Sequence, residues 1–394
     1  MKLRRKLLVL GSVVVAGSAA AIAPMVASNA ATACAPAWSS TAVYIGGNSA
    51  SQNGHNYSAK WWTQNESPAT HSGQWDVWAD SGTCGGGTTT PPTTGPTTAP
   101  PTTGTKMASA PYIYPGWGNP PAPATVVNAT GVKAFTMAFV LAGNGCNPAW
   151  DGEGGLTGGV HASTIAAIKA AGADVIPSIG GYSGNKLGPN CTTVDALAGA
   201  YQKVIDAFGL KAIDVDIENT DEFENYAVQD RILGALKVVK QKNPSVKTIL
   251  TFGTTTSGPS GTGVRLVQQA KALGAGVDVF TQMPFDFGGS DMYTNTVNAS
   301  ESLKNLLKST FGYTDAQAYS HMGISGMNGL SDQQELTSTD TWTRIRDYAS
   351  GKGFARFTFW AVNRDRGCAG GGVVSDCSGI AQADWAFTKI SAGF

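Results

Sequence analysis

The sequence has few histidines and no excess of charge of either sign. Its 394 residues include 27 Lys plus Arg, 27 Asp plus Glu and only four histidines, which are His55, His71, His161 and His321. A balanced charge provides no basic surface for phosphate backbones or anionic lipid. We therefore expect neither a nucleic acid nor a membrane surface among the partners of this protein.

Common site motifs are missing as well. The chain has no GxGxxG or P-loop arrangement, and its cysteines form no CxxC pair. Gly181-Tyr182-Ser183-Gly184 is not a nucleophile elbow, because its second glycine comes one residue early. With so few histidines we expect neither a Ser-His triad nor a histidine metal site, and we interpret 151–155 as an exposed turn rather than a cation loop. The sequence predicts no metal and no organic cofactor.

The amino terminus has the pattern of an export signal. Basic residues precede an apolar run over 7–23 that is too short for a membrane span, and small residues allow cleavage after Ala30 or Ala33. No second apolar segment of about twenty residues follows. We predict a signal peptide over 1–33 and a secreted, extracellular mature protein. A lipid anchor on Cys34 is the alternative, although the residues before this cysteine lack the leucine that is usual in a lipid-attachment motif.

The cysteines are even in number, which suits disulfide bonds in an oxidising compartment. Cys34 and Cys84 bracket a first domain that is small enough to need such a bond. Three pairings of the remaining four cysteines are possible, and we expect Cys146–Cys191 together with Cys368–Cys377.

Composition divides the mature chain into two domains. Residues 85–106 are rich in Thr, Pro and Gly and carry no large apolar side chain to offset the entropy of ordering. We predict a fairly extended, mobile linker there, between a module at 34–84 and a catalytic domain at 107–394. A tether of this kind lets two domains act at separate places on one large object, which favours an insoluble substrate.

The module at 34–84 is rich in large aromatic rings. So many rings exceed what a small core holds, and exposed indoles stack on the faces of sugars. The alternative is that all of them belong to the core. The rings are those of Trp38, Tyr44, Tyr57, Trp61, Trp62, Trp75 and Trp78.

The second domain alternates apolar, β-rich runs with amphipathic helical stretches. This pattern over 107–394 predicts one (β/α)8 TIM barrel, with a doubly wound sheet as the alternative. In a barrel the chemistry lies at the carboxyl ends of the strands. We predict strands near 111–114, 133–141, 173–178, 211–217, 247–252, 277–283, 320–325 and 355–361, and helices over 194–208, 222–241, 264–273 and 332–349.

The sharpest local feature is the segment IDVDIE at 213–218. Side chains alternate faces along a strand, so Asp214, Asp216 and Glu218 share the inward face while the apolar residues between them pack under the helices. Three inward carboxylates cannot all stay charged at low cost, so we expect a shared proton and a raised pKa, as a general acid requires. The alternative, a solvated acidic edge strand, does not explain the apolar residues between the acids.

This segment resembles the DxxDxDxE signature of family 18 glycoside hydrolases, a TIM-barrel family of chitinases and related proteins. Asp214, Asp216 and Glu218 match its last three acidic positions. The first position is Lys211 here. By strand parity Lys211 lies on the other face, so this departure is expected to affect support of the strand more than chemistry.

Two further strand ends resemble motifs of the same family. Residues 178–181, SIGG, are similar to its SxGG motif, which implies that Gly180 and Gly181 let the chain pass close to the sugar. Trp360 ends the eighth expected strand and resembles the tryptophan that forms the floor of the subsite for the cleaved sugar. Both likenesses imply substrate contacts at the carboxyl ends of strands.

The segment QMPFD at 282–286 aligns with the MxYD segment of the family. The usual tyrosine is Phe285 here, so the hydroxyl that helps to hold the acetyl group of the substrate is missing and activity could be reduced. Gln282, Met283 and Asp286 remain as candidate substrate contacts.

The small module resembles family 5/12 carbohydrate-binding modules. The likeness rests on YSAKWWT at 57–63, on Trp75 and on the closing cysteine. It implies that Tyr57, Trp61 and Trp62 contact chitin.

Taken together, the resemblance implies a secreted bacterial chitinase with a retaining, substrate-assisted mechanism. Glu218 would protonate the leaving oxygen and later activate water, and the 2-acetamido oxygen of the sugar would attack its own anomeric carbon. Asp216 would stabilise the positive charge of that intermediate, and Asp214 would hold or share the proton of Asp216. The expected partners are chitin or chitooligosaccharides, bound by a monomer.

Two other functions remain open. Some members of this barrel family are lectins that bind chitin without cleaving it, but they usually lose the acid at the position of Glu218. An endo-β-N-acetylglucosaminidase uses the same acids but has little use for a chitin-binding module. Short strand-to-helix connections favour an open cleft and endo cleavage.

Overall fold

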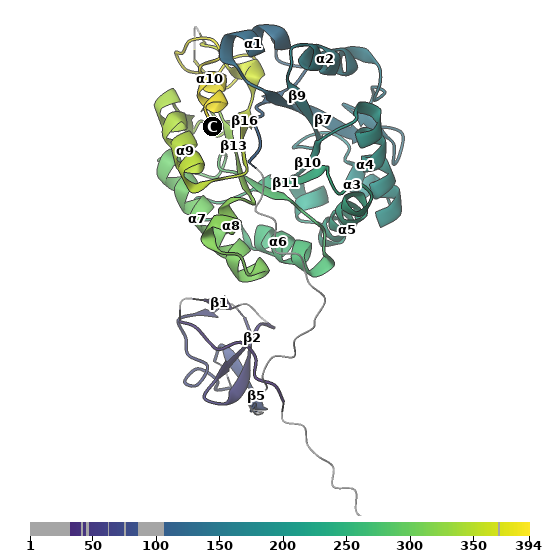
Figure 1. Ribbon diagram of the computed structural model, residues 1–394. Helices are drawn as coiled ribbons and strands as arrows, with labels where there is room; N and C mark the ends of the chain where they lie inside the picture. Colours follow the sequence, from purple (N-terminus) through teal and green to yellow (C-terminus); the bar gives the residue numbers. More distant parts are fainter. Residues whose placement is uncertain are drawn as a thin grey trace, which may run out of the picture. The chain divides into compact units, whose positions relative to one another are not determined.

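The computed structural model describes residues 32–40, 42–44, 47–61, 63–74, 76–85, 106–368 and 371–394. Two compact units, Met1–Thr97 and Thr98–Phe394, divide the chain and are described separately (Figure 1). The predicted signal peptide and most of the predicted linker lie outside the described residues and stay predictions.

The first unit is a small antiparallel β structure. Ala50, Tyr57, Ala59 and Trp78 form its core, and a disulfide bond joins Cys34 to Cys84 as predicted. Strands β2 and β3 pair through a tight turn in which Asn53 and Gly54 have φ of 53° and 78°, the left-handed conformation that these two residue types adopt most easily. The strands are β1 (Val43–Tyr44), β2 (Ser49–Gln52), β3 (His55–Ala59), β4 (Thr63–Gln64) and β5 (Trp78–Thr83).

The second unit is a parallel β barrel surrounded by helices, as Figure 1 shows from one end of the barrel. The eight predicted strands are all present, and the TIM-barrel prediction is confirmed. The barrel closes between its first and last strands, where Met107 N donates to Ala355 O at 2.8 Å and Ala110 N donates to Phe357 O at 3.3 Å. The strands are β6 (Tyr112–Ile113), β7 (Ala134–Ala142), β9 (Asp174–Gly180), β10 (Ala212–Ile217), β11 (Lys247–Gly253), β12 (Val279–Met283), β13 (Met322–Met327) and β16 (Arg356–Trp360).

The helices of the barrel begin and end at residues suited to those positions. Thr193 and Ser260 cap the amino ends of α4 and α6 through their hydroxyls, and the left-handed glycines Gly209 and Gly274 end the same helices. The helices are α1 (Pro123–Thr130), α2 (Gly159–Ala170), α3 (Leu187–Asn190), α4 (Val194–Phe208), α5 (Tyr226–Lys242), α6 (Gly261–Leu273), α7 (Met292–Phe311), α8 (Asp315–Tyr319), α9 (Thr339–Lys352) and α10 (Ala386–Ala392). In the described part of the chain no helix combines the length and the apolarity needed to cross a membrane.

Two predicted helices begin later than expected. The helix predicted over 222–241 starts at Tyr226, because Asn225 caps it and the preceding residues form a separate π-helical turn, η1 (Asn219–Phe223). The helix predicted over 332–349 starts at Thr339 with Ser338 as its cap. The residues before it instead form the short hairpin β14 (Gly329–Leu330) and β15 (Leu336–Thr337).

The cysteines of the barrel pair as predicted. Cys146 bonds to Cys191, and Cys368 bonds to Cys377. The first bond ties the end of α3 to the loop that precedes β8 (Pro148–Trp150), a short strand that pairs antiparallel with β7. Both bonds therefore fasten loops that follow the barrel strands.

Candidate active site

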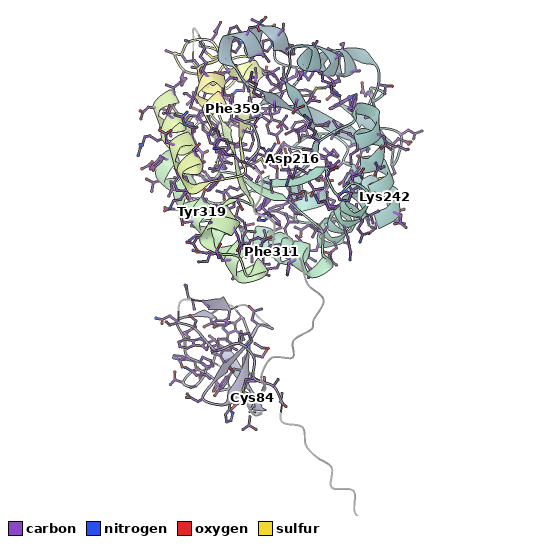
Figure 2. All side chains as sticks on the ribbon, in the orientation of Figure 1. Cys84, Asp216, Lys242, Phe311, Tyr319 and Phe359 are labelled. Carbon is purple, nitrogen blue, oxygen red and sulfur yellow. A yellow bond between two sulfur atoms is a disulfide. The ribbon has the colours of Figure 1, made fainter. Side chains whose placement is uncertain are left out.

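A cleft of about 1050 Å³ opens at the carboxyl ends of the barrel strands. Its lining comes from residues on different strands or just after them, among them Tyr112, Phe139, Asp216, Met283 and Trp360. Figure 2 labels Asp216 inside the ring of strands, viewed along the barrel. The cleft therefore lies where a barrel of this kind places its chemistry.

Asp214 lies at the bottom of the acidic strand β10 and is fully buried. Its Oδ2 accepts hydrogen bonds from Tyr112 Oη at 2.6 Å and Ser178 Oγ at 2.9 Å. Its Oδ1 accepts from Thr251 Oγ1 at 2.6 Å and from Arg356 Nη1 at 3.3 Å. Four donors therefore satisfy both oxygens of this carboxyl group and fix its position.

Asp216 lies two residues after Asp214 on β10 and lines the cleft. It is 3% exposed, and its Oδ1 has no hydrogen-bond partner among the described residues. Burial raises the pKa of Asp216 well above its usual value, and the negative charges of Glu218 and Asp214 raise it further. The raised pKa that we expected among these acids is therefore found at Asp216.

Glu218 directly follows β10 and lines the same cleft. Burial raises its pKa to about 7, against the opposing charge of Lys186, and the carboxylates of Asp286 and Asp332 add to the increase. A carboxyl with a pKa near neutrality is able to give up a proton and take it back at ordinary pH. Glu218 has the properties of a general acid.

Lys211 lies away from the acids, as strand parity predicts. Its Nζ forms an ion pair with Asp174 Oδ2 at 2.9 Å, and both side chains are largely exposed. Lys211 precedes β10, so this pair lies at the amino end of the strand, opposite the cleft. The residue that departs from the family signature therefore does not contact the carboxyl group of Asp216 or Glu218.

Trp360 ends β16 and contributes an aromatic floor to the cleft. Its ring stacks on that of Phe139, with centroids 5.6 Å apart and an interplanar angle of 12°. Tyr112, Tyr114 and Trp117 surround it at centroid distances of 5.8, 6.2 and 6.0 Å. An apolar platform of this kind suits the face of a sugar ring.

The end of β12 divides its side chains between the cleft and the outer layer. Met283, Phe285 and Asp286 line the cleft. Gln282 is fully buried, and its side-chain amide lies 2.6 Å from Ser300 Oγ of α7. The prediction that Gln282 contacts substrate is wrong, because strand alternation turns it toward the helices while Met283 faces inward.

Gly180 and Gly181 do not line the cleft either, so the predicted contact with sugar is corrected. Both have left-handed φ, of 114° and 85°, and Gly181 N donates to Asp216 O at 2.9 Å. A Cβ on Gly180 would lie 2.1 Å from Asp216 O, and one on Gly181 would lie 2.7 Å from Phe139 Cζ. Gly180 is thus required for close packing of β9 against the strand that carries the acids, and Gly181 for the close approach of Phe139 on β7.

Comparisons with known proteins agree with this geometry. No protein-family model matches the chain. A probable bifunctional chitinase/lysozyme of Escherichia coli is 29% identical over 281 residues, which cover 66% of this chain and 31% of that protein. Endochitinase 11 of Metarhizium anisopliae is 29% identical over 256 residues, or 59% of this chain and 48% of that protein.

A solved structure gives the same indication. The active domain 2 of a chitinase from Pyrococcus furiosus has a TM-score of 0.67 and 25% identity to this chain, and the match covers 75% of this chain and 97% of that domain. The chain is therefore similar to these chitinases in sequence and, over the barrel, in fold. It spans between about a third and a half of the length of the curated relatives that it matches.

Several residues in the cleft or beneath it were not predicted from the sequence. Arg356 and Thr251, which hold Asp214, are polar residues within apolar strands, and that contrast was the only available signal. Asp151 lies in a turn that we predicted to be merely exposed, yet it lines the cleft. Asp151 accepts a hydrogen bond from Tyr114 Oη at 2.8 Å and lies 3.3 Å from His161 Nε2.

Arg364 and Asp332 form another unpredicted part of the wall. Arg364 is 1% exposed, donates to Val374 O and Leu330 O, and has no partner for Nη1 among the described residues. Burial lowers the pKa of Arg364 to about 10, although the charges of Asp332 and Asp286 raise it.

Within the described residues no group of three or more His, Cys, Asp or Glu side chains is arranged to hold a metal ion.

The first unit exposes one of the aromatic residues predicted to bind chitin. Trp61 is 49% exposed, whereas Trp78 is fully buried and donates from Nε1 to Glu66 O at 2.8 Å. Tyr57 is only 6% exposed and packs in the core, so the prediction that it contacts chitin is corrected. Trp62 and Trp75 lie outside the described residues.

Proposed function

We propose that this protein is a chitinase that hydrolyses β-1,4-linked N-acetylglucosamine polymers with retention of configuration. The observation that carries the proposal is the pair of acids in the cleft lined by Trp360, a buried Asp216 whose pKa is raised and a Glu218 whose pKa is about 7. Homology to chitinases supports the same reaction. A lectin has no need for a titrating carboxyl at this position.

In the proposed mechanism Glu218 gives its proton to the glycosidic oxygen, and the bond from that oxygen to the anomeric carbon breaks. The acetamido oxygen of the same sugar attacks the anomeric carbon and forms a cyclic, positively charged intermediate. Glu218 then takes a proton from water, whose oxygen opens the intermediate at the anomeric carbon. Two displacements at one carbon give net retention.

Asp216 would orient the acetamido group during these steps. A carboxyl oxygen of Asp216 accepts the acetamido N–H, which turns the acetamido oxygen toward the anomeric carbon. The partial negative charge of that oxygen faces the positive charge that develops on the ring. Asp214 holds its negative charge behind Asp216 and is itself held by Arg356. The network fixes the acids before substrate binds, so little reorganisation is needed in the transition state.

Phe285 lines the cleft without a hydroxyl to hold the acetamido oxygen. We infer that orientation of the acetamido group depends mainly on Asp216 in this protein. The aromatic floor around Trp360 supplies apolar contact to the sugar ring and excludes water from the acids. The resulting enzyme would work with a lower affinity for its substrate than one that has the hydroxyl.

The first unit would act as a chitin-binding module of a secreted enzyme. Its exposed Trp61 offers a flat surface to a crystalline polysaccharide, and its disulfide bond suits an oxidising compartment. A linker rich in Thr, Pro and Gly would let this module hold the polymer while the barrel cleaves it. We also propose endo cleavage by a monomer.

Hydrolysis of N-acetylglucosamine oligomers by the wild type and by Glu218→Gln tests the proposal. Products are identified by mass spectrometry, and the anomeric form of the new end is followed by NMR. We expect cleavage with retention by the wild type and at least a 1000-fold loss in the variant, roughly the full contribution of the general acid. If both proteins bind the oligomers and neither cleaves them, the protein is a lectin. Cleavage of glycoprotein glycans alone would indicate an endo-β-N-acetylglucosaminidase.

A further inference from the structure

Glu222 is a buried carboxyl group near the cleft that the proposed mechanism does not use. It lies in η1, the turn that follows Glu218, and is only 3% exposed. Its Oε1 accepts a hydrogen bond from Gly188 N at 3.2 Å, and its Oε2 has no partner among the described residues. A buried carboxylate oxygen without a donor is costly, so the geometry favours the protonated, neutral form.

The contacts of η1 join it to one wall of the cleft. Tyr182, Ser183 and Gly184 line the cleft, and Tyr182 O accepts a hydrogen bond from Asn219 Nδ2. The same wall segment, 182–188, ends at Gly188, whose backbone meets Glu222. The turn that carries Glu222 therefore holds this wall at both of its ends.

The packing between Glu222 and the wall leaves no spare room. A Cβ on Gly188 would lie 2.5 Å from Glu222 Oε1 and 2.8 Å from Val228 Cγ1. Arg231 of α5 donates from Nη1 to Gly188 O at 2.9 Å, so the same glycine is held from a second side. A change in the state of the Glu222 carboxyl is thus transmitted to the backbone of the wall.

Charged and titratable groups reach Glu222 from four elements, which are the wall, the turn η1, the strand β10 with the residue after it, and α4. Lys186 belongs to the wall itself, is 1% exposed and donates from Nζ to Ser183 O at 2.6 Å and to Gly184 O at 3.3 Å. Asp221 lies on the same turn and Glu218 directly before it, while Asp216 of β10 and Tyr201 of α4 interact with Glu222 from other elements. Burial raises the pKa of Glu222 to about 8, because the charge of Lys186 offsets only part of the desolvation.

We propose that Glu222 is a positioning residue whose protonated carboxyl holds the wall segment 182–188 against the turn that follows Glu218. The inference rests on the proposed chitinase function, because the wall acts by shaping the substrate cleft. A carboxylate accepts the hydrogen bond from Gly188 N more strongly than a carboxylic acid does, but burial opposes the charge more than this bond favours it, and Oε2 has no donor among the described residues. The desolvation cost of the ionised group therefore drives the side chain toward water and releases the wall. Substrate binding then weakens, while the catalytic step still depends on the protonation of Glu218 alone.

Steady-state kinetics of Glu222→Gln against pH test this role. Glutamine keeps the size of the side chain and stays neutral, and Glu224→Gln, at an exposed position that directly follows the same turn, is the matched control. If only the protonated form is competent, the KM of the wild type for a soluble oligomer rises about tenfold at one pH unit above the pKa. We expect that rise in the wild type and in Glu224→Gln, and a flat KM in Glu222→Gln. The same rise in Glu222→Gln overturns the proposal.

Stability against pH gives a readout that needs no enzymatic activity. The pKa of Glu222 is higher in the folded protein than in the unfolded chain, so the folded state binds more protons between the two values. The unfolding midpoint of the wild type should therefore fall as pH rises toward about 8, and that slope should be smaller in Glu222→Gln. Equal slopes in the two proteins would contradict a buried proton, even if the wild type proves not to be a chitinase.

A second variant separates position from charge. Gly188→Ala pushes a methyl group against Glu222 Oε1 without changing any ionisable residue. We expect its KM to be raised severalfold at every pH, with the alkaline limb of kcat unchanged. A shift of that limb, or an unaltered KM, would contradict a wall held in place by the contact between Gly188 and Glu222.

Discussion

Arg356 Nη1 lies 3.3 Å from Asp214 Oδ1, and both side chains are completely buried. Two strands that are far apart in the sequence, β10 and β16, are thus joined by an ion pair at the centre of the barrel. Arg356 also donates to the hydroxyls of Thr251, Thr281 and Thr136 at 3.0 to 3.1 Å. The guanidinium group is therefore held in place by three hydroxyls of the barrel interior in addition to the carboxyl group of Asp214.

Replacing Arg356 with methionine should strongly destabilise the protein. The substitution leaves Asp214 as a buried carboxylate without its cation, a change that costs about 3–5 kcal/mol. Chemical denaturation followed by circular dichroism measures the free energy of unfolding. Lys211→Met, which removes the exposed pair with Asp174, is the control and should change that free energy little. Equal losses in both variants would show that the buried pair has no special role.

The pH dependence of catalysis should report the proton on Glu218. The general acid must be protonated, so kcat/KM should be high below the pKa of about 7 and fall as pH rises through it. The charge of Asp332 contributes to that raised pKa, so Asp332→Asn should move the alkaline limb to lower pH. Asp384→Asn, at an exposed position, is the control. A limb that stays in place in Asp332→Asn would contradict this electrostatic coupling.

The central acids could be predicted because strand alternation is a local property of the chain. Parity along 213–218 placed Asp214, Asp216 and Glu218 on one face and Lys211 on the other, and the structure has them so. The same rule, applied to β12, would have turned Gln282 outward. We instead assigned it as a contact because it adjoins a family motif, and that prediction was wrong.

The supports of the acids could not be predicted in the same way. Arg356 and Tyr112 reach Asp214 from strands separated from it by more than a hundred residues, so no local pattern places them together. Glu222 was missed for a related reason. It falls in a stretch predicted as the start of a helix, and only the folded turn η1 brings it under the wall at Gly188.

Phe285→Tyr should improve the enzyme. In the family that the sequence resembles, a tyrosine at this position supplies a hydroxyl for the acetyl group, and Phe285 lines the cleft next to Asp286. One added hydrogen bond is worth about 1 kcal/mol, or about a fivefold gain in kcat/KM for acetylated oligomers. Kinetics on acetylated and deacetylated oligomers measure the effect, and the gain should appear only with the acetylated series. An equal gain on both series would place the new hydroxyl on another part of the sugar.

Trp61→Ala should weaken adsorption to insoluble chitin and leave hydrolysis of soluble oligomers unchanged. The indole is 49% exposed, whereas the rings of Tyr57 and Trp78 are buried, so its removal takes away contact area without opening the core. Loss of one stacking aromatic should lower the affinity for chitin by about tenfold. Tyr226→Ala, a ring of similar exposure on the barrel, is the control and should adsorb like the wild type. If both variants adsorb equally well, chitin is held by a surface that does not include Trp61, and the proposed role of the first unit must move to other residues.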